Sequence, residues 1–391
     1  MEEAVMISPN HPDRSEQIAT LALLVLGGGQ LDREQARFLA TLEGDDLYDL
    51  FYWANKIRIR FVGRQVKFCS IVTGKTGACS EDCSYCSQSK HYKTHVTPDK
   101  MSVEDMLNAS DEAMANGASS MGIVNSGRGP TERELDWMEP FFRKTAEEGK
   151  IRPCATLGEL TPEQAKRLKD MGVQRVNHNL ETSARHFDQI VSTHSYQDRV
   201  RTIQNAKAAG LSICSGGIFG MGEDWDDRID MALALRDLGA DVVPINFLNA
   251  IQGTPMYGEV TPLEPMEALQ IIAVYRFLLP DRELKIAGGR EKILRDMQSW
   301  IFFAGGSSFL IGNYLTTFGR TPKQDHQMLR DLGLSFTTFD EVEHAADPAA
   351  ALDRSPGHAS KAREGALMAR RDGSLVALPV LNQGEKPLAA V

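Results

Sequence analysis

Three cysteines crowd into one short segment, CSEDCSYC, as Cys79, Cys83 and Cys86. This C-x3-C-x2-C spacing allows a single loop to wrap an iron–sulfur cubane, because thiolates are the ligands that such clusters take from proteins. Three local thiolates bind only three of the four irons of a cubane. The pattern therefore predicts a 4Fe-4S cluster with one iron left open for an amino-carboxylate chelate from a small molecule.

A structural zinc site is the alternative reading of these thiolates, with His91 or His95 as the fourth ligand. Zinc sites of this kind usually pair two C-x2-C knuckles across a longer spacer, and this segment contains a single such pair. Unligated cysteines in an exposed loop would oxidise readily. The spacing favours the iron–sulfur cluster over both alternatives.

Other reactive and polar residues interrupt short apolar, β-rich runs along the chain. They are Cys69, Cys154, Asn177, Asn179, Cys214 and Asn246, with Arg290 just beyond the run ELKIAG. In a closed barrel these side chains would converge on one central cavity, whereas an open sheet would scatter them over two faces. We therefore expect a barrel with its site inside.

The alternation of elements agrees with that expectation. From residue 66 onward, β-rich runs alternate with amphipathic stretches, many of which end in glycine, as is typical where a left-handed helix cap leads into the next strand. About eight βα units can be counted, which predicts an α/β protein with a TIM-type (β/α)8 barrel.

Three segments are predicted along the chain. Residues 1–62 show apolar positions at helical spacing and are expected to form an N-terminal helical extension. Residues 63–336 are expected to form the catalytic barrel. Residues 337–391 are rich in Ala, Pro, Gly and charge, and a flexible C-terminal tail is expected there.

Composition narrows the class of function. The 391 residues are 42% hydrophobic, enough for one large core, and 43 basic against 53 acidic residues give a net charge of -10 without a basic tract. This argues against nucleic acid or an anionic membrane as partner. The apolar run at residues 21–26 is too short to span a bilayer and lacks the basic start of a signal peptide. Six cysteines are sparse for a disulfide scaffold and three of them lie within eight positions, which indicates thiolates kept for metal in a reducing cytoplasm.

The cysteine motif, with Tyr85 before its last cysteine, resembles that of the radical S-adenosylmethionine superfamily. The surrounding sequence is similar to the biotin synthase family. The similar segments are KTGACSEDCSYCSQS (75–89), NHNLETS (177–183), CSGGIFGMGE (214–223), VPINFL (243–248), QGTP (252–255) and AGGRE (287–291). The similarity runs in unbroken order from about residue 66 to 334, far more than one motif could supply.

The resemblance implies an activity and a cofactor. Biotin synthases insert sulfur between two unactivated carbons of dethiobiotin, after a 5′-deoxyadenosyl radical has removed a hydrogen from each. S-adenosylmethionine would bind the open iron of the 4Fe-4S cluster. A closed barrel suits this chemistry, because the protein must orient the substrate and exclude quenchers.

The resemblance also assigns roles to individual residues. Asn179 and Glu181 would contact S-adenosylmethionine, although family members often have Asp at the latter position. Asn177 and Asn246 would hydrogen-bond the ureido ring of dethiobiotin, with satisfied strand-end polar groups as the alternative reading.

Tyr85 and two glycines are assigned to the cofactor as well. Gly216 and Gly217 would allow the backbone to approach the cofactor, and ordinary turn glycines are the alternative.

An auxiliary cluster is where the sequence departs from the family pattern. Well-known members hold a 2Fe-2S cluster, the proposed sulfur source, with three cysteines and an arginine. Cys154, Cys214 and Arg290 match this set, but Gly122 stands where the third cysteine is expected. Cys69 would then complete the set, and Gly122 would leave room for a displaced or larger cluster. The alternative is that Cys69 is a small buried hydrophobic residue.

The expected partners are dethiobiotin, an electron donor such as flavodoxin or ferredoxin, and a second copy of the chain. Two other functions compete with this one. A related radical enzyme, of the kind that matures hydrogenase or rearranges lysine, could use the same barrel. An iron or redox sensor is the non-enzymatic alternative, but no helix-turn-helix or basic stripe is visible.

Overall fold

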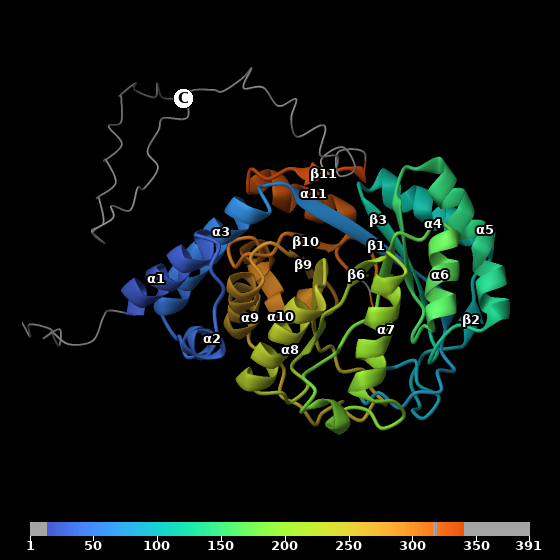
Figure 1. Cartoon of the computed structure of the whole chain (residues 1–391), viewed down its shortest axis with the longest axis horizontal. Coiled ribbons are helices and arrows are strands. Elements are labelled where there is room, and N and C mark those ends of the chain that lie inside the picture. Colours follow the sequence, from blue (N-terminus) through green and yellow to red (C-terminus); the bar gives the residue numbers. More distant parts are fainter. Residues whose placement is uncertain (1–13, 316, 318, 340–391) are drawn as a thin grey trace, which may run out of the picture. The chain divides into compact units, whose positions relative to one another are not determined.

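A computed structural model describes residues 14–315, 317 and 319–339 of the chain, and Figure 1 shows its fold. Eight parallel strands form a closed barrel, which confirms the predicted (β/α)8 class. The ring closes because β1 pairs in parallel with its neighbours on both sides. The barrel strands are β1 (Val66–Thr76), β3 (Ser120–Asn125), β4 (Arg152–Thr156), β5 (Arg175–Asn177), β6 (Ser212–Cys214), β8 (Val242–Phe247), β9 (Glu283–Ile286) and β10 (Ser308–Leu310).

Three shorter strands extend this sheet. β2 (Asp99–Lys100) pairs antiparallel with the end of β1, and β7 (Gly217–Phe219) continues the path of β6 along β8. β11 (Phe336–Thr337) pairs with the first residues of β1. The boundary predicted at residue 336 falls inside this last strand, and the predicted tail beyond residue 339 lies outside the described residues.

Helices follow the strands and cover the outside of the barrel. The α-helices are α1 (Arg14–Leu26), α2 (Arg33–Ala40), α3 (Asp46–Phe61), α4 (Val103–Ala115), α5 (Glu132–Glu148), α6 (Pro162–Asp170), α7 (Tyr196–Ala208), α8 (Trp225–Leu238), α9 (Pro265–Leu278), α10 (Arg290–Leu294) and α11 (Pro322–Asp331). Two 3₁₀ helices, η1 (Phe187–Gln189) and η2 (Arg295–Ile301), complete the set in the described ranges. None of the described helices is long and apolar enough to cross a membrane.

Local sequence fixes where many of these helices begin and end. A capping box starts α5, where the Thr131 hydroxyl accepts from the Glu134 amide and the Glu134 carboxylate accepts from the Thr131 amide. α2, α6, α7, α8 and α11 start in the same way. Gly149 and Gly239 end α5 and α8 with left-handed φ angles of 59° and 66°, as the glycine pattern predicts.

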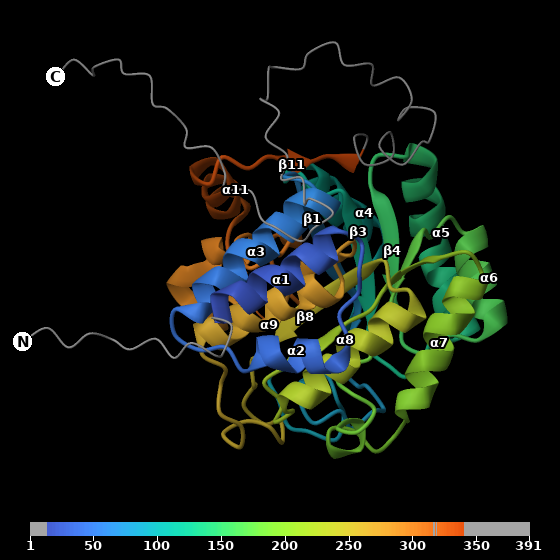
Figure 2. The ribbon, with the colours of Figure 1, turned by 60° about the vertical axis from the view of Figure 1, so that its left-hand side comes forward.

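Of the N-terminal helices, α2 packs on α8 and α9, α3 packs on α9, and α1 packs on α3, and this layer can be followed in Figure 2. α9 is covered on all sides, because every residue from Ala268 to Leu278 is buried. The Gln270 amide donates to the carbonyls of Leu39 and Ala40 at the end of α2 and of Leu42 just beyond it. Arg37 of α2 forms an ion pair with Asp226 of α8. The extension therefore completes the outer layer of the barrel.

The inner face of the barrel opens into a cavity of about 440 Å³. Side chains alternate along each strand, so every second residue points inward. Residues that line the cavity in this way include Cys69, Asn177, Cys214, Asn246 and Lys285. The loops after the strands add further walls, among them the segment that carries Cys79, Cys83 and Cys86.

Candidate functional site

The cysteine segment leaves β1 as a compact loop. The Cys86 amide donates to the Cys83 carbonyl at 3.0 Å, and the Lys90 amide donates to the Cys79 carbonyl at 2.8 Å. Asp82 ties the loop to a second segment, because its carboxylate accepts from the amides of Ser192 and Thr193 at 3.0 and 3.1 Å. The loop is therefore held in shape by the chain itself.

The Asp82 anchor carries a negative charge. Burial alone would raise the pKa of its carboxyl, but the hydrogen bonds from Ser192 and Thr193 outweigh burial and hold that pKa well below its usual range. The anchor between the two segments is therefore ionised at neutral pH.

The three loop thiols all line the cavity, and Cys83 is 8% exposed. Burial raises the pKa of Cys83 to about 12 and that of Cys86 to about 11. These two thiols stay protonated at neutral pH unless a metal displaces the proton. Soft, buried sulfur donors around an accessible space fit an iron–sulfur cluster.

The zinc alternative finds no support. Within the described ranges, no three His, Cys, Asp or Glu side chains converge closely enough to hold a single metal ion. His91, one of the two histidines considered as fourth ligand, makes a 2.9 Å hydrogen bond through Nε2 to the Ser80 carbonyl. A cubane has no need of such convergence, because each cysteine binds a different iron.

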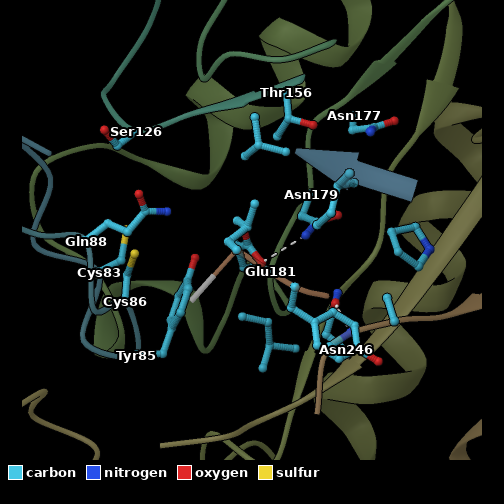
Figure 3. Close-up of a pocket in the computed structure, with 18 of the residues that line it drawn as sticks. Cys83, Tyr85, Cys86, Gln88, Ser126, Thr156, Asn177, Asn179, Glu181 and Asn246 are labelled. Atoms are coloured by element: carbon cyan, nitrogen blue, oxygen red, sulfur yellow. Dashed lines mark hydrogen bonds between the residues drawn. The ribbon is translucent and has the colours of Figure 1, made fainter. Parts of the chain in front are cut away.

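Polar residues stand across the cavity from the cysteine loop. Figure 3 shows Cys83, Cys86 and Tyr85 on one side and Asn179 on the other, with Glu181 between them. The Asn179 amide donates to the Glu181 carboxylate at 3.3 Å. Burial raises the pKa of Tyr85 well above its usual value, so its ring is a neutral wall of the site.

Glu181 is held in place by a buried arginine. Arg199 of α7 donates to the Asn179 carbonyl at 3.0 Å and lies 3.4 Å from the Glu181 carboxylate. Glu181 also has φ of 71°, a backbone conformation that non-glycine residues adopt only where surrounding structure imposes it. A carboxylate, an amide and a guanidinium thus form one polar wall that can receive an adenosine ribose or an amino acid group.

The structure gives Gly216 and Gly217 a packing role, and their assignment to the cofactor stays a prediction. Neither residue lines the cavity. A Cβ atom at Gly216 would lie 2.0 Å from the Pro244 carbonyl oxygen, and one at Gly217 would lie 2.4 Å from the Glu181 carbonyl oxygen. These glycines allow neighbouring strands to approach closely, and their backbones pair with the Glu181 segment.

The two asparagines predicted to bind the ureido ring differ in their free capacity. Both line the cavity, but the Asn246 amide already donates to the Gly217 carbonyl and accepts from the Gly288 amide, each at 3.0 Å. Asn177 has a buried carbonyl oxygen without a hydrogen-bond partner, and so does Nε2 of the neighbouring His178. Unpartnered buried polar atoms that face a cavity indicate a missing ligand.

Three more cysteines lie deeper in the barrel, on its first, third and fifth strands. Cys69, Cys154 and Cys214 are each no more than 2% exposed, and the first and last of them line the cavity. Lys285 of β9 lies against this trio, with its Nζ 3.5 Å from the Cys69 sulfur and 3.5 Å from the Cys214 sulfur. Inward residues of alternate strands share a layer, which explains the grouping.

Gly122 on β3 pairs with Cys154 and Ile71 of the flanking strands. A Cβ atom here would lie 3.3 Å from the Ile71 side chain and 3.4 Å from the Asn177 amide nitrogen. A side chain at Gly122 would thus be in close contact with two side-chain ends, and the role of Gly122 in making room for a cluster stays a prediction.

Charge surrounds the deep trio. Burial raises the pKa of Cys154 to about 12, although Arg175 opposes this effect. Burial also raises the pKa of Cys214, against the opposing effect of Lys285. The Arg175 guanidinium is 6% exposed and donates to the Ser212 hydroxyl at 3.3 Å.

The described hydrogen bonds of Arg290 go to residues other than these cysteines, and its predicted place beside the auxiliary site stays a prediction. Its fully buried guanidinium lies 2.7 Å from the Asp325 carboxylate, 2.6 Å from the Gln298 amide oxygen and 3.2 Å from the Tyr314 hydroxyl. The turn at Gly288–Gly289 directs it outward at the start of α10, after β9 has ended. It fastens α11 to the barrel and contacts two residues that line the cavity, Tyr314 and Leu310.

Sequence reasoning missed Lys285 and Arg199. Lys285 lies two residues before Ala287, and both line the cavity, so strand periodicity applied to ELKIAG would have placed this lysine inward. Arg199 carries no comparable signal, because an arginine on an amphipathic helix usually faces solvent.

The role of Arg290 can be tested through stability. Arg290→Met leaves the Asp325 carboxylate buried beside Arg320 alone, and we expect the free energy of unfolding to fall by about 3 kcal/mol. Urea denaturation of the cluster-free protein measures this loss. The double variant Arg290→Met/Asp325→Leu should regain at least part of the loss, since it removes both charges. An unchanged urea midpoint in the single variant would contradict the structural role.

Comparisons with solved structures agree with the barrel. A methylornithine synthase matches with a TM-score of 0.73 and 19% identity, covering 83% of this chain and 99% of that chain. A maturase of the [FeFe]-hydrogenase matches with a TM-score of 0.71 and 16% identity, covering 82% of this chain and 75% of that one. At these identities the likeness concerns the fold.

Comparisons of sequence are closer. Residues 74–235 match the radical SAM superfamily, and residues 244–335 match the biotin and thiamin synthesis associated domain. A biotin synthase of Heliobacterium modesticaldum is 48% identical over 312 residues, which is 80% of this chain and 95% of the relative. One of Gloeothece citriformis is 45% identical over 347 residues, 85% of this chain and 96% of the relative. The chain therefore belongs to the biotin synthase family.

Proposed function

We propose that the barrel cavity is where this chain converts dethiobiotin to biotin. The observation that carries the proposal is the presence of two cysteine sets in one cavity of about 440 Å³. The loop thiols of Cys79, Cys83 and Cys86 stand at the ends of the strands, and the sulfurs of Cys69 and Cys214 lie on the inner wall. A radical-generating cluster and a sulfur-donating cluster would thus face one substrate.

When bound, the 4Fe-4S cluster and S-adenosylmethionine supply the 5′-deoxyadenosyl radical, and the auxiliary cluster supplies the sulfur. The protein must hold the reacting groups close together and keep water out. The cavity walls suit this task, because apolar residues such as Ile71, Val124 and Leu310 separate the polar groups.

The polar wall opposite the cysteine loop would bind S-adenosylmethionine. The Glu181 carboxylate is suited to the ribose hydroxyls, because it is buried, lines the cavity and is held by Arg199. The Asn179 amide donates a hydrogen bond to this carboxylate and helps to orient it. Arg199 keeps its charge at neutral pH, so the carboxylate has a permanent counterion.

Asn177 is the best placed residue for the ureido ring of dethiobiotin. Its unpartnered carbonyl oxygen would accept from a ureido N–H, and the free Nε2 of His178 lies beside it along the chain. Burial lowers the pKa of His178 well below its usual value, so this ring is neutral and adds no charge to the substrate site. The Asn246 amide already bonds the backbone of Gly217 and Gly288, so it would offer the substrate only its remaining hydrogen-bonding capacity.

The auxiliary cluster would be held by Cys69, Cys154 and Cys214. Burial raises the pKa values of Cys154 and Cys214, because an unligated thiolate is costly there, and both thiols would release their protons when iron binds. The proposal covers a 2Fe-2S cluster or a larger one. An electron donor of the flavodoxin or ferredoxin type, a homodimer and a reducing cytoplasm complete the proposal and are supported by the family membership.

Cleavage of S-adenosylmethionine tests the first cysteine set. Anaerobically reconstituted protein with a reductant should produce methionine and 5′-deoxyadenosine. Cys79→Ala, Cys83→Ala and Cys86→Ala should each abolish this reaction, because each thiolate holds one of three irons while the fourth iron binds the cofactor. Cys154→Ala is the matched control and should still cleave. Cleavage that persists in any of the three loop variants would sink the assignment.

Binding of dethiobiotin tests the substrate site. Asn177→Ala removes a partner of the ureido group, which costs about 1–3 kcal/mol and weakens affinity by roughly tenfold or more. Titration calorimetry on reconstituted protein with S-adenosylmethionine measures this change. Asn205→Ala on the outer face of α7, where the amide bonds the Leu160 carbonyl, serves as control. Equal affinity in the wild type and Asn177→Ala would remove Asn177 from the site.

Cys69 tests the auxiliary set. Cys69→Ser should lose auxiliary iron and biotin formation and still cleave S-adenosylmethionine, because the loop cysteines are untouched. Iron and sulfide analysis together with product assays provide the measurement. Should this variant keep its full iron content and biotin output, Cys69 is a packing residue.

A further inference from the structure

Two buried cations lie against the deep cysteines. Lys285 is 3% exposed and Arg175 is 6% exposed, and in the described part of the chain neither has a carboxylate oxygen within 4 Å. A buried charge without a counterion is costly, so such charges are normally paired or bound to an anion. The two cations thus lack a direct ion pair, the buried Glu283 carboxylate attracts both only at longer range, and this inner layer of the barrel favours a negatively charged occupant.

The nearest acidic residue by sequence does not fill that role. Glu283 lies on the same strand, two residues before Lys285, and its carboxylate is 3.4 Å from Nζ of Lys67. Arg175 in turn donates to the Ser212 hydroxyl. Among the described residues, the sulfurs of Cys69 and Cys214 are thus the only partners within hydrogen-bond distance of Nζ of Lys285, and the Glu283 carboxylate attracts its charge from farther away.

Lys285 brings together two cysteines from opposite sides of the barrel. Its Nζ lies 3.5 Å from the sulfur of Cys69, on the first barrel strand, and 3.5 Å from that of Cys214, on the fifth. Because both sulfurs are within 3.5 Å of the same nitrogen, to which they are hydrogen-bonded, the two sulfurs can be no more than about 7 Å apart. An ammonium has three N–H donors, and two of them are directed at sulfur here. Because an ammonium nitrogen has no free lone pair, it does not ligate iron in this state.

We propose that Lys285 is a positioning residue of the auxiliary site, donating hydrogen bonds to the sulfurs of Cys69 and Cys214 and balancing the charge of the cluster they hold. This inference rests on the proposed function, because that function supplies the cluster. Arg290, the cation that the sequence resemblance suggests, is occupied elsewhere by Asp325. In this chain the cation beside the deep cysteines is Lys285, and it would act on the cluster through hydrogen bonds to the cysteine sulfurs.

Two measurable properties follow. N–H donors and positive charge near cluster sulfurs stabilise the more negative, reduced state, and so raise the reduction potential. They also hold the thiolates in place and slow the loss of iron. Lys285→Met keeps the length and apolar stem of the side chain while removing its charge and donors. Lys285→Arg keeps both, and Lys67→Met is a matched control on a lysine that does not contact the trio.

The experiment uses the full chain after anaerobic reconstitution. S-adenosylmethionine cleavage is measured in each variant as a check that the barrel and the loop cluster are intact. The release of auxiliary iron to a chelator and the potential of the auxiliary cluster are then measured. We expect Lys285→Met to release iron about tenfold faster, or to lower the potential by about 59 mV, which is tenfold for a one-electron couple. Lys285→Arg and Lys67→Met should remain close to wild type.

Pulsed electron resonance after exchange into deuterated water gives an independent readout. Exchangeable protons coupled to the auxiliary cluster should be seen in the wild type and lost in Lys285→Met. A strong coupling to the lysine nitrogen itself, typical of direct ligation, would overturn the proposal. So would wild-type iron release and potential in Lys285→Met, or equal loss in Lys285→Met and Lys285→Arg.

Failure of the proposed function gives a different result. If the wild type binds no iron beyond the loop cluster, the auxiliary site itself is wrong, and the Lys285 proposal falls with it. If Lys285→Met does not cleave S-adenosylmethionine, Lys285→Gln replaces it in every comparison. That variant keeps a neutral N–H donor and must then show the faster release or the lower potential.

Discussion

Closure of the parallel barrel is the constraint from which the site follows. Once β1 pairs with both β3 and β10, no strand has a free edge, and every second residue must point into one enclosed space. Cys69 on the first strand and Cys214 on the fifth come from distant parts of the chain, yet one lysine nitrogen bonds both. The same rule keeps Asn177 and Asn246 in the cavity wall.

Stability and chemistry are assigned to different layers of the fold. The outer layer contains the apolar contacts, the capping boxes and the buried helix α9, which the N-terminal helices cover. The inner layer contains groups that cost stability when left alone, including thiols with raised pKa values and buried cations. A barrel can tolerate such an interior because its hydrophobic core lies between the sheet and the helices.

The sequence was sufficient for the barrel, for the cysteine loop and for the inward placement of Cys69 and Cys214, because these depend on local periodicity. The sequence was insufficient at the ends of strands, where a shift of one residue decides whether a side chain points into the cavity. Arg290 follows a glycine turn that rotates it away from the cavity, whereas Lys285, still within β9, points inward. Gly216 and Gly217 have the composition of a cofactor loop, but the carbonyls of Pro244 and Glu181 occupy the space beside them. Such contacts depend on tertiary packing, which no single segment encodes.

Placing Cys69 and Cys214 in the same cavity as the loop cysteines has a consequence for the proposed function. If the deep cysteines hold a sulfur donor, that donor would be consumed when its sulfur leaves with the product, and a further turnover would need its repair. In the described part of the chain, material that reaches Cys69 and Cys214 through this cavity must cross the space that substrate and cofactor would fill. Under the proposed function, repair through this cavity and synthesis would therefore exclude each other in time.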